Sequence, residues 1–150
     1  MGGKSMTPKE YLKQAYRLDK IIDSMVKEVE ELRSLLSAIQ SPQFGERVQT
    51  TRDNEAKFVK NLYKIEEFEE TINYKIDRLI DLKKQMSEVI SSVSNPDEQL
   101  VLRHRYLLGQ TWEQISDELV ADPTTIYRWH KKALNSLELP NDIIVIANSY

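Results

Sequence analysis

The side chains with the clearest capacity for specific chemistry lie in residues 122–137, a stretch with helical periodicity. Thr124, Tyr127 and Arg128 fall on one polar face of that helix. An arginine within two turns of a helix start can donate two hydrogen bonds to O6 and N7 of guanine. Hydroxyl and ammonium groups can bind phosphate oxygens. The face is therefore predicted to contact DNA through Thr124, Thr125, Tyr127, Arg128, Lys131 and Lys132.

Three short helical patterns would position this face. The first opens at Asn95, whose side chain can cap free backbone amides, and ends at Gly109. The second opens at Thr111 with the spacing of a capping box. The third opens at Asp122-Pro123, a cap followed by a first-turn proline. This spacing is typical of a helix-turn-helix unit, with a core predicted from Trp112, Ile115, Leu119, Ile126, His130, Ala133 and Leu137.

These residues also carry a resemblance. The run RYLLGQTWEQISDEL, followed by TTIYRWHKKAL, is similar to the last DNA-binding region (region 4) of sigma-70-type factors. Residues 7–137, with the leading YLKQAYRLDKIID, resemble small proteins from phages and prophages of Gram-positive bacteria, grouped with ArpU/RinA-type late transcriptional regulators. The resemblance implies a sequence-specific transcriptional regulator that reads the major groove with helix 122–137. It also implies RNA polymerase as a second partner.

Two positions depart from that pattern. Val120 stands where the tight turn between the second and third helices usually has glycine, and a β-branched residue tolerates positive φ poorly. We therefore expect a reshaped turn. Asp122 replaces the more usual serine cap, which places a negative charge where a phosphate would approach the helix. We expect weaker backbone contacts there.

Two long amphipathic patterns precede the helix-turn-helix unit. Thr7 caps the first, in which apolar residues alternate spacings of four and three as in a coiled coil. Residues 40–52, which include Pro42 and Gly45, break the periodicity and are predicted to form a loop. The second pattern runs over residues 58–93. The predicted seam of the first helix is Tyr11, Ala15, Leu18, Ile22, Met25, Val29, Leu32, Leu36 and Ile39.

The loop can reverse the chain direction, so the fold class predicted is all-α: a long antiparallel, coiled-coil-like helical hairpin followed by a C-terminal helix-turn-helix bundle. Each hairpin helix buries one stripe, so a second protomer would help close the core and we expect a homodimer. The predicted division is an artificial leader over 1–5, a hairpin over 6–94, a DNA-binding unit over 95–139 and an apolar tail over 140–150.

Charge predicts only weak long-range attraction to DNA. The chain has a formal net charge of −3, and residues 95–139 contain five Lys/Arg against seven Asp/Glu. A positive surface would have to be local, formed by Arg128, Lys131 and Lys132 with help from Arg103 and Arg105. We expect modest affinity, or help from a partner.

Other chemistries lack the residues that they need. There is no cysteine, so no disulfide or thiolate metal site can form, and no apolar run approaches the roughly 20 residues that span a bilayer. His104 and His130 lie on different predicted helices without a third ligand, and no glycine-rich phosphate loop is present. We expect no enzyme activity, no cofactor, no metal, no membrane contact and a cytoplasmic location. His130 is predicted to be a packing residue with one hydrogen bond.

Three points stay open at this level. The apolar run 141–147 has a strand-like composition and must dock, either on the core of the DNA-binding unit or on a partner chain. A phage DNA-packaging component akin to small terminase subunits would combine the same helix-turn-helix with helical oligomerisation. A structural adaptor that does not bind DNA would suit the acidic count and Val120.

Overall fold

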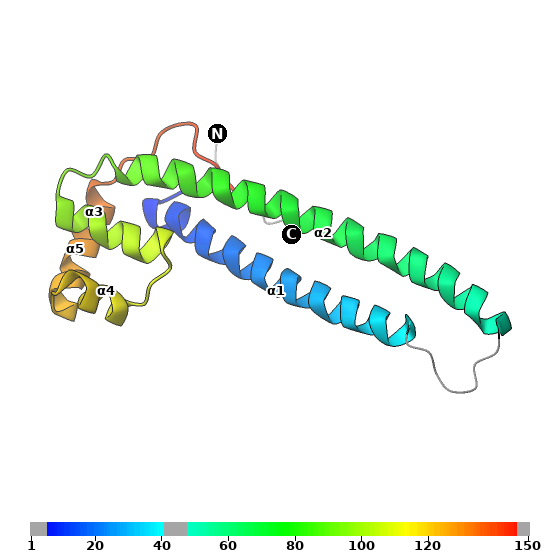
Figure 1. Ribbon diagram of the computed structural model, residues 1–150. Helices are drawn as coiled ribbons and strands as arrows, with labels where there is room; N and C mark the ends of the chain where they lie inside the picture. Colours follow the sequence, from blue (N-terminus) through cyan, green and yellow to red (C-terminus); the bar gives the residue numbers. More distant parts are fainter. Residues whose placement is uncertain (1–5, 41–47, 147–150) are drawn as a thin grey trace. The chain divides into compact units, whose positions relative to one another are not determined.

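The computed structural model describes residues 6–40 and 48–146, and over these ranges the protein is all-α (Figure 1). Two long helices pack antiparallel as a hairpin, and shorter helices follow, so the predicted fold class is confirmed. A π-helical segment continues the first short helix. The elements are α1 (Pro8–Gln40), α2 (Val48–Ile90), α3 (Pro96–Leu102), η1 (Arg103–Leu107), α4 (Trp112–Leu119) and α5 (Pro123–Ser136).

The second long helix starts earlier than the apolar pattern indicates. α1 ends at Gln40 and α2 begins at Val48, so the loop predicted over 40–52 is wrong for residue 40 and for residues 48–52. That turn and a half consists mostly of polar residues, which can extend a helix but give no apolar period to detect. Residues 41–47 of the same loop lie outside the described residues, as do the leader 1–5, the last tail residues 147–150 and the side chain of Ile39.

Contacts divide the chain into two compact units. Unit 1 comprises Met1–Asp19 with Leu79–Tyr150, and unit 2 comprises Lys20–Arg78. Unit 1 thus combines the start of α1 and the end of α2 with every short helix. The boundaries drawn from the sequence separate segments by pattern, whereas these units separate them by contact, so the two divisions describe different properties.

Unit 2 is a two-helix segment with a narrow core. Its buried apolar side chains are spaced seven residues apart on each helix, as in a coiled-coil seam. Leu32, predicted to lie in the seam, is 38% exposed, and Met25 is half-buried. The seam is therefore less continuous here than its apolar pattern predicts. The buried apolar residues of unit 2 are Ile22, Val29, Leu36, Ile65 and Ile72.

Unit 1 holds the larger core. Tyr11 and Leu12 of α1 are fully buried, as are Leu82 and Met86 of α2. The side chain of Thr7 accepts a hydrogen bond from the backbone N–H of Glu10, so the predicted cap of α1 is confirmed. Within the described ranges, no helix combines the length and apolar character needed to cross a membrane.

Candidate nucleic-acid interface

The orientation of α5 is set by its apolar stripe. Ile126, His130 and Ala133 are buried, and Leu137 at the end of the helix is buried too, as predicted. Ile126 packs with Val101 of α3 and Ile115 of α4 in one apolar cluster. Full burial of side chains this size contributes roughly 1.5–3 kcal/mol each, so the stripe fixes which side of α5 faces the core. The opposite side is left on the surface.

The polar face of α5 is exposed along its length. Tyr127 is 67% exposed, and Thr124, Arg128, Lys131 and Lys132 are exposed as well. Thr125 differs, because its side chain is half-buried and its backbone N–H donates to the Asp122 carboxylate at 2.8 Å. Five of the six candidate residues therefore lie where a ligand could reach them, on one rigid helix.

Capping side chains define the ends of the short helices as the sequence predicts. Asn95 accepts hydrogen bonds from the backbone N–H groups of Asp97 and Glu98 at the start of α3. Thr111 and Gln114 form a reciprocal capping box at the start of α4. Each of these bonds satisfies an amide that has no partner within its helix. Starts fixed in this way limit fraying of the helices that carry the exposed face.

The turn between α4 and α5 keeps a left-handed residue without glycine. Val120 adopts φ 50° and ψ 53°. Its backbone N–H donates to the Asp117 carbonyl at 3.4 Å, and the Ala121 N–H donates to the Ser116 carbonyl at 3.1 Å. The Ser116 hydroxyl donates in turn to the Ala121 carbonyl. The expectation that valine reshapes this turn is therefore wrong, because the surrounding hydrogen bonds hold the usual path.

Asp122 places a carboxylate at the start of α5. The hydrogen bond from the Thr125 N–H lowers the pKa of this carboxyl below its ordinary value, and the charge of Arg128 acts in the same direction. Asp122 is therefore ionised at neutral pH. Its charge is favourable for the helix terminus but opposes a phosphate approaching the same amides.

Arg103 does not contribute to a positive surface in the way that we expected. Its Nε donates to Gln99, while Nη1 donates to the hydroxyl of Ser87 on α2 (2.9 Å) and Nη2 to the hydroxyl of Ser91 directly after α2 (2.7 Å). The guanidinium thus ties the short helices to the end of the hairpin. Ser87 lies in the last turn of α2 and Ser91 directly follows the helix, but nothing in the local sequence identifies them as partners of an arginine on another helix.

Arg105 is also occupied within the fold. Its Nη1 donates to the carbonyl of Gln110 at 3.0 Å, and its guanidinium lies 4.4 Å from the centre of the Trp112 ring. Both interactions hold the segment between η1 and α4 against the start of α4. With Arg103 and Arg105 half-buried and engaged, the positive face of the helix-turn-helix reduces to Arg128, Lys131 and Lys132.

His130 is a buried packing residue, as predicted. Its Nε2 lies 2.8 Å from the Tyr106 hydroxyl, and its ring meets that of Trp112 in a T-shaped arrangement with centres 4.7 Å apart. Burial lowers the pKa of His130 to about 4, assisted by the positive charges of Lys9, Arg105 and Lys13. The imidazole is therefore neutral at physiological pH. Its partner Tyr106 was not identified from the sequence, because it lies on a different helix.

Comparison with known proteins gives one match. A family model described as "Protein of unknown function (DUF1492)" matches residues 38–138. Neither the curated proteins nor the solved structures gave a match. The matched range includes all of α2 and all the helices of the helix-turn-helix unit, about two thirds of the chain. On that coverage, the protein belongs to the DUF1492 family.

Proposed function

We propose that this protein is a sequence-specific DNA-binding transcriptional regulator of phage origin that reads the major groove with α5. The observation that carries the proposal is the exposed polar face of α5, held outward by a buried stripe on the opposite side. The similarity of RYLLGQTWEQISDEL and TTIYRWHKKAL to the last DNA-binding region of sigma-70-type factors supports the same reading.

The dimensions of α5 suit this role. Fourteen residues at about 1.5 Å per residue make a helix of roughly 21 Å, and a helix of roughly 10–12 Å diameter fits the major groove of B-DNA. Arg128 lies in the second turn, from which a guanidinium can reach a guanine edge. Thr124 can contact a thymine methyl group or a phosphate, and Tyr127 can bind phosphate or pack on a sugar. Lys131 and Lys132 suit the phosphate backbone.

The charge distribution supports a DNA-binding protein of modest affinity. Only three cations lie on the exposed face of α5, so few phosphates would be neutralised and binding would depend less steeply on salt than in strongly basic proteins. We propose that a homodimer compensates, because two copies would read two half-sites and their binding energies would combine. RNA polymerase is the second proposed partner, as the sigma-like resemblance implies.

One alternative has specific support. A structural adaptor with a helix-turn-helix that does not bind DNA is favoured by the internal bonds of Arg103 and Arg105 and by the ionised Asp122 beside the start of α5. The two hypotheses differ at low salt, where phosphate contacts are strongest. An adaptor would show no duplex binding there. A packaging protein would differ from both by forming ring-sized assemblies in solution.

The direct test is selection of bound duplexes from a random-sequence library at moderate salt, with the unchanged chain and with Arg128→Ala. We expect an enriched motif that loses about 1–3 kcal/mol of discrimination at one base pair in the variant. Arg128→Lys keeps the charge without the two-pronged donor geometry, so it should restore affinity but not discrimination. Lys27→Ala, which removes the same charge from unit 2, is the matched control. No enriched motif with the unchanged chain would refute the proposal.

A further inference from the structure

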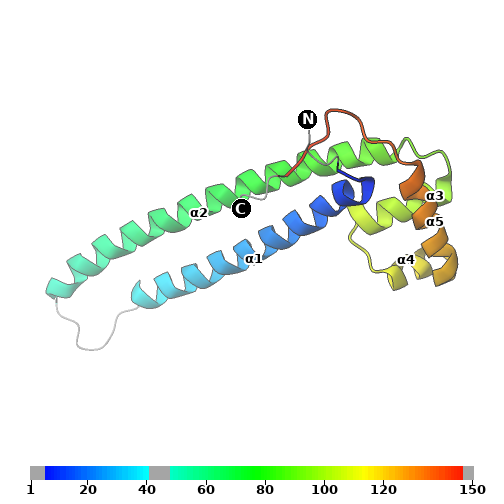
Figure 2. The ribbon, with the colours of Figure 1, turned by 180° about the vertical axis from the view of Figure 1, so that it is seen from behind.

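The segment after α5 is held against the hairpin by two glutamine side chains. We call residues 142–146 the strap, which runs beside the end of α2 (Figure 2). Gln85 Nε2 donates to the Asp142 carbonyl at 3.1 Å, and the Ile144 N–H donates to Gln85 Oε1 at 2.8 Å. Gln14 Nε2 donates to the Ile144 carbonyl at 3.0 Å, and the Ile146 N–H donates to Gln14 Oε1 at 2.7 Å. The apolar tail therefore docks on α1 and α2.

These four bonds have the pattern of an extended chain paired along the edge of a β-sheet, but glutamine side chains take the place of the neighbouring strand. A carboxamide side chain carries both N–H donors and a carbonyl acceptor, so it can pair with an extended backbone as a peptide group does and still bind Tyr11. The bonds fall on alternate residues of the strap, which is the spacing of an extended chain paired along one edge. Val145, between two bonded residues, is 54% exposed, consistent with that alternation. Gln14 and Gln85 thus recognise backbone geometry and not particular side chains.

Tyr11 holds both glutamines in place. The Tyr11 hydroxyl donates to Gln85 Oε1 at 2.8 Å, and Gln14 Nε2 donates to the Tyr11 carbonyl at 3.1 Å. Tyr11 is fully buried, and burial raises its pKa to about 12, so its hydroxyl stays a donor. These contacts are made by α1 and α2 alone, so the two amides are oriented without help from the strap. Such preorganisation lowers the cost of binding an extended segment.

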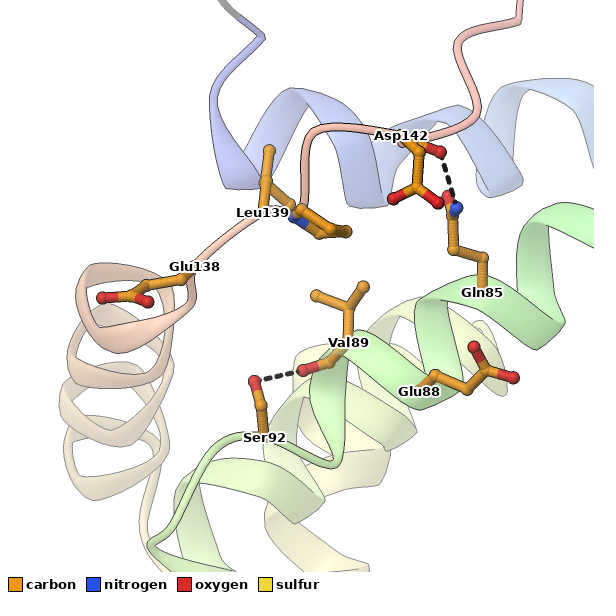
Figure 3. Close-up of a pocket in the computed structure, with 8 residues that line it drawn as sticks. Gln85, Glu88, Val89, Ser92, Glu138, Leu139 and Asp142 are labelled. Atoms are coloured by element: carbon orange, nitrogen blue, oxygen red, sulfur yellow. Dashed lines mark hydrogen bonds between the residues drawn. The ribbon is translucent and has the colours of Figure 1, made fainter.

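The connection between α5 and the strap is loosely packed. Leu137 leaves the helix with extended backbone angles, and residues 138–140 line one side of an open cavity of about 440 Å³ whose other side is the end of α2 (Figure 3). Gln85 and Val89 form the α2 side of this cavity, and Leu139 faces it from the connection. A connection with so little packing can take another path at small cost, which is the property that hinges of exchanged segments need.

We propose that Tyr11, Gln14 and Gln85 form a binding site for an extended peptide backbone, and that in a dimer residues 142–146 of a second copy fill this site. A second copy supplies a chemically identical strap, so exchange recreates every hydrogen bond. Exchange and self-binding compete, and the exchanged form gains as protein concentration rises. The inference does not depend on DNA binding.

A complementation experiment tests the exchange with full-length chains. The first chain carries Gln14→Met and Gln85→Met, which keep side-chain length but abolish the site and leave the strap intact. The second carries Ile144→Pro and Ile146→Pro, which remove the two strap donors and leave the site intact. Neither can complete the pairing alone, whereas a mixture can. Native mass spectrometry then measures the fraction of heterodimer.

The control mixture pairs the first chain with one carrying all four substitutions, so that it contains no intact site. We expect at least a several-fold larger heterodimer fraction in the complementary mixture. Equal fractions in the two mixtures would overturn the proposal. A dimer formed through other surfaces of the hairpin contributes equally to both mixtures and does not affect the comparison.

Two further variants guard against misfolding. In the first of these, the second chain carries Val145→Pro in place of the two isoleucine substitutions, which puts a proline in the strap but keeps both donors. This chain can bind its own strap, so complementation should be lost. Circular dichroism verifies helix content, and Ile144→Pro alone replaces the double substitution if helicity falls. Complementation with Ile144→Pro supports exchange, and its absence in a folded chain refutes it.

Discussion

Replacing Val120 with glycine should stabilise the protein. Val120 adopts φ 50°, in the left-handed region that β-branched residues tolerate poorly, and its side chain is 90% exposed. The side chain therefore contributes almost no packing that a substitution could remove. The turn itself is held by backbone hydrogen bonds from Val120 and Ala121, which glycine retains.

The magnitude follows from two opposing effects. Left-handed backbone costs an L-residue about 1–2 kcal/mol, which glycine avoids. Glycine in turn gives the unfolded chain more freedom, which costs roughly 0.4–1 kcal/mol. Taken from the middle of each range, the difference predicts a gain of about 0.5–1 kcal/mol in the free energy of unfolding. Val120→Ala keeps a Cβ in the same conformation, so its gain should be smaller than that of Val120→Gly.

Urea unfolding followed by circular dichroism measures the effect. With a slope of about 1–3 kcal/mol per molar urea, the expected gain moves the midpoint upward by roughly 0.2–1 M. Glu118→Gly is the matched control, because it places glycine at an exposed helical position two residues earlier, where it should cost about 0.5–1 kcal/mol. An unchanged or lower midpoint for Val120→Gly would refute the reasoning that this valine is strained.

Three other predictions concern the charged and titrating groups of unit 1. Asp122→Ser keeps a good cap but removes a negative charge, so duplex affinity at fixed salt should rise in a fluorescence anisotropy titration; equal affinity would mean that no phosphate approaches this terminus. The unfolded state binds a proton at His130 near pH 6.5 and the folded state only near pH 4, so stability should fall by about 1–3 kcal/mol as pH drops from 6.5 to 4. His130→Gln should show a shallower decline over that interval in urea unfolding, and an identical decline would contradict the assignment. Arg103→Met should lower the free energy of unfolding by about 1–3 kcal/mol. Ser87→Ala should lower it when Arg103 is present but not in the Arg103→Met variant, and that difference would verify that the two side chains are coupled.

The parts of this fold that sequence could predict are those governed by neighbours in the chain. Asn95, Thr111 and Asp122 cap helices because each needs only an amide two or three residues ahead. The buried stripe of α5 follows from a period of 3.6 residues, and that period also determined which candidate side chains are exposed.

The parts that could not be predicted depend on partners distant in sequence. Arg103 looks like a surface cation until Ser87 and Ser91 are brought beside it. The apolar run 141–147 suggests a strand by composition, yet residues 142–146 pair with the side chains of Gln14 and Gln85, and the described part of the chain holds no strand for them to join. The residues around a glutamine on a helix do not indicate whether its amide is solvated or binds a backbone.

The make-up of unit 1 has a consequence for synthesis on the ribosome. Tyr11 is synthesised 74 residues before its partner Gln85, and Gln14 is synthesised 130 residues before Ile144, to which it bonds. Until Gln85 and its neighbours on α2 are synthesised, the apolar side of the start of α1 lacks the partners that cover it in the folded protein. A chaperone that holds unfolded chains would therefore bind there. An excised fragment of residues 95–139 would likewise lack the hairpin ends against which Arg103 closes the unit.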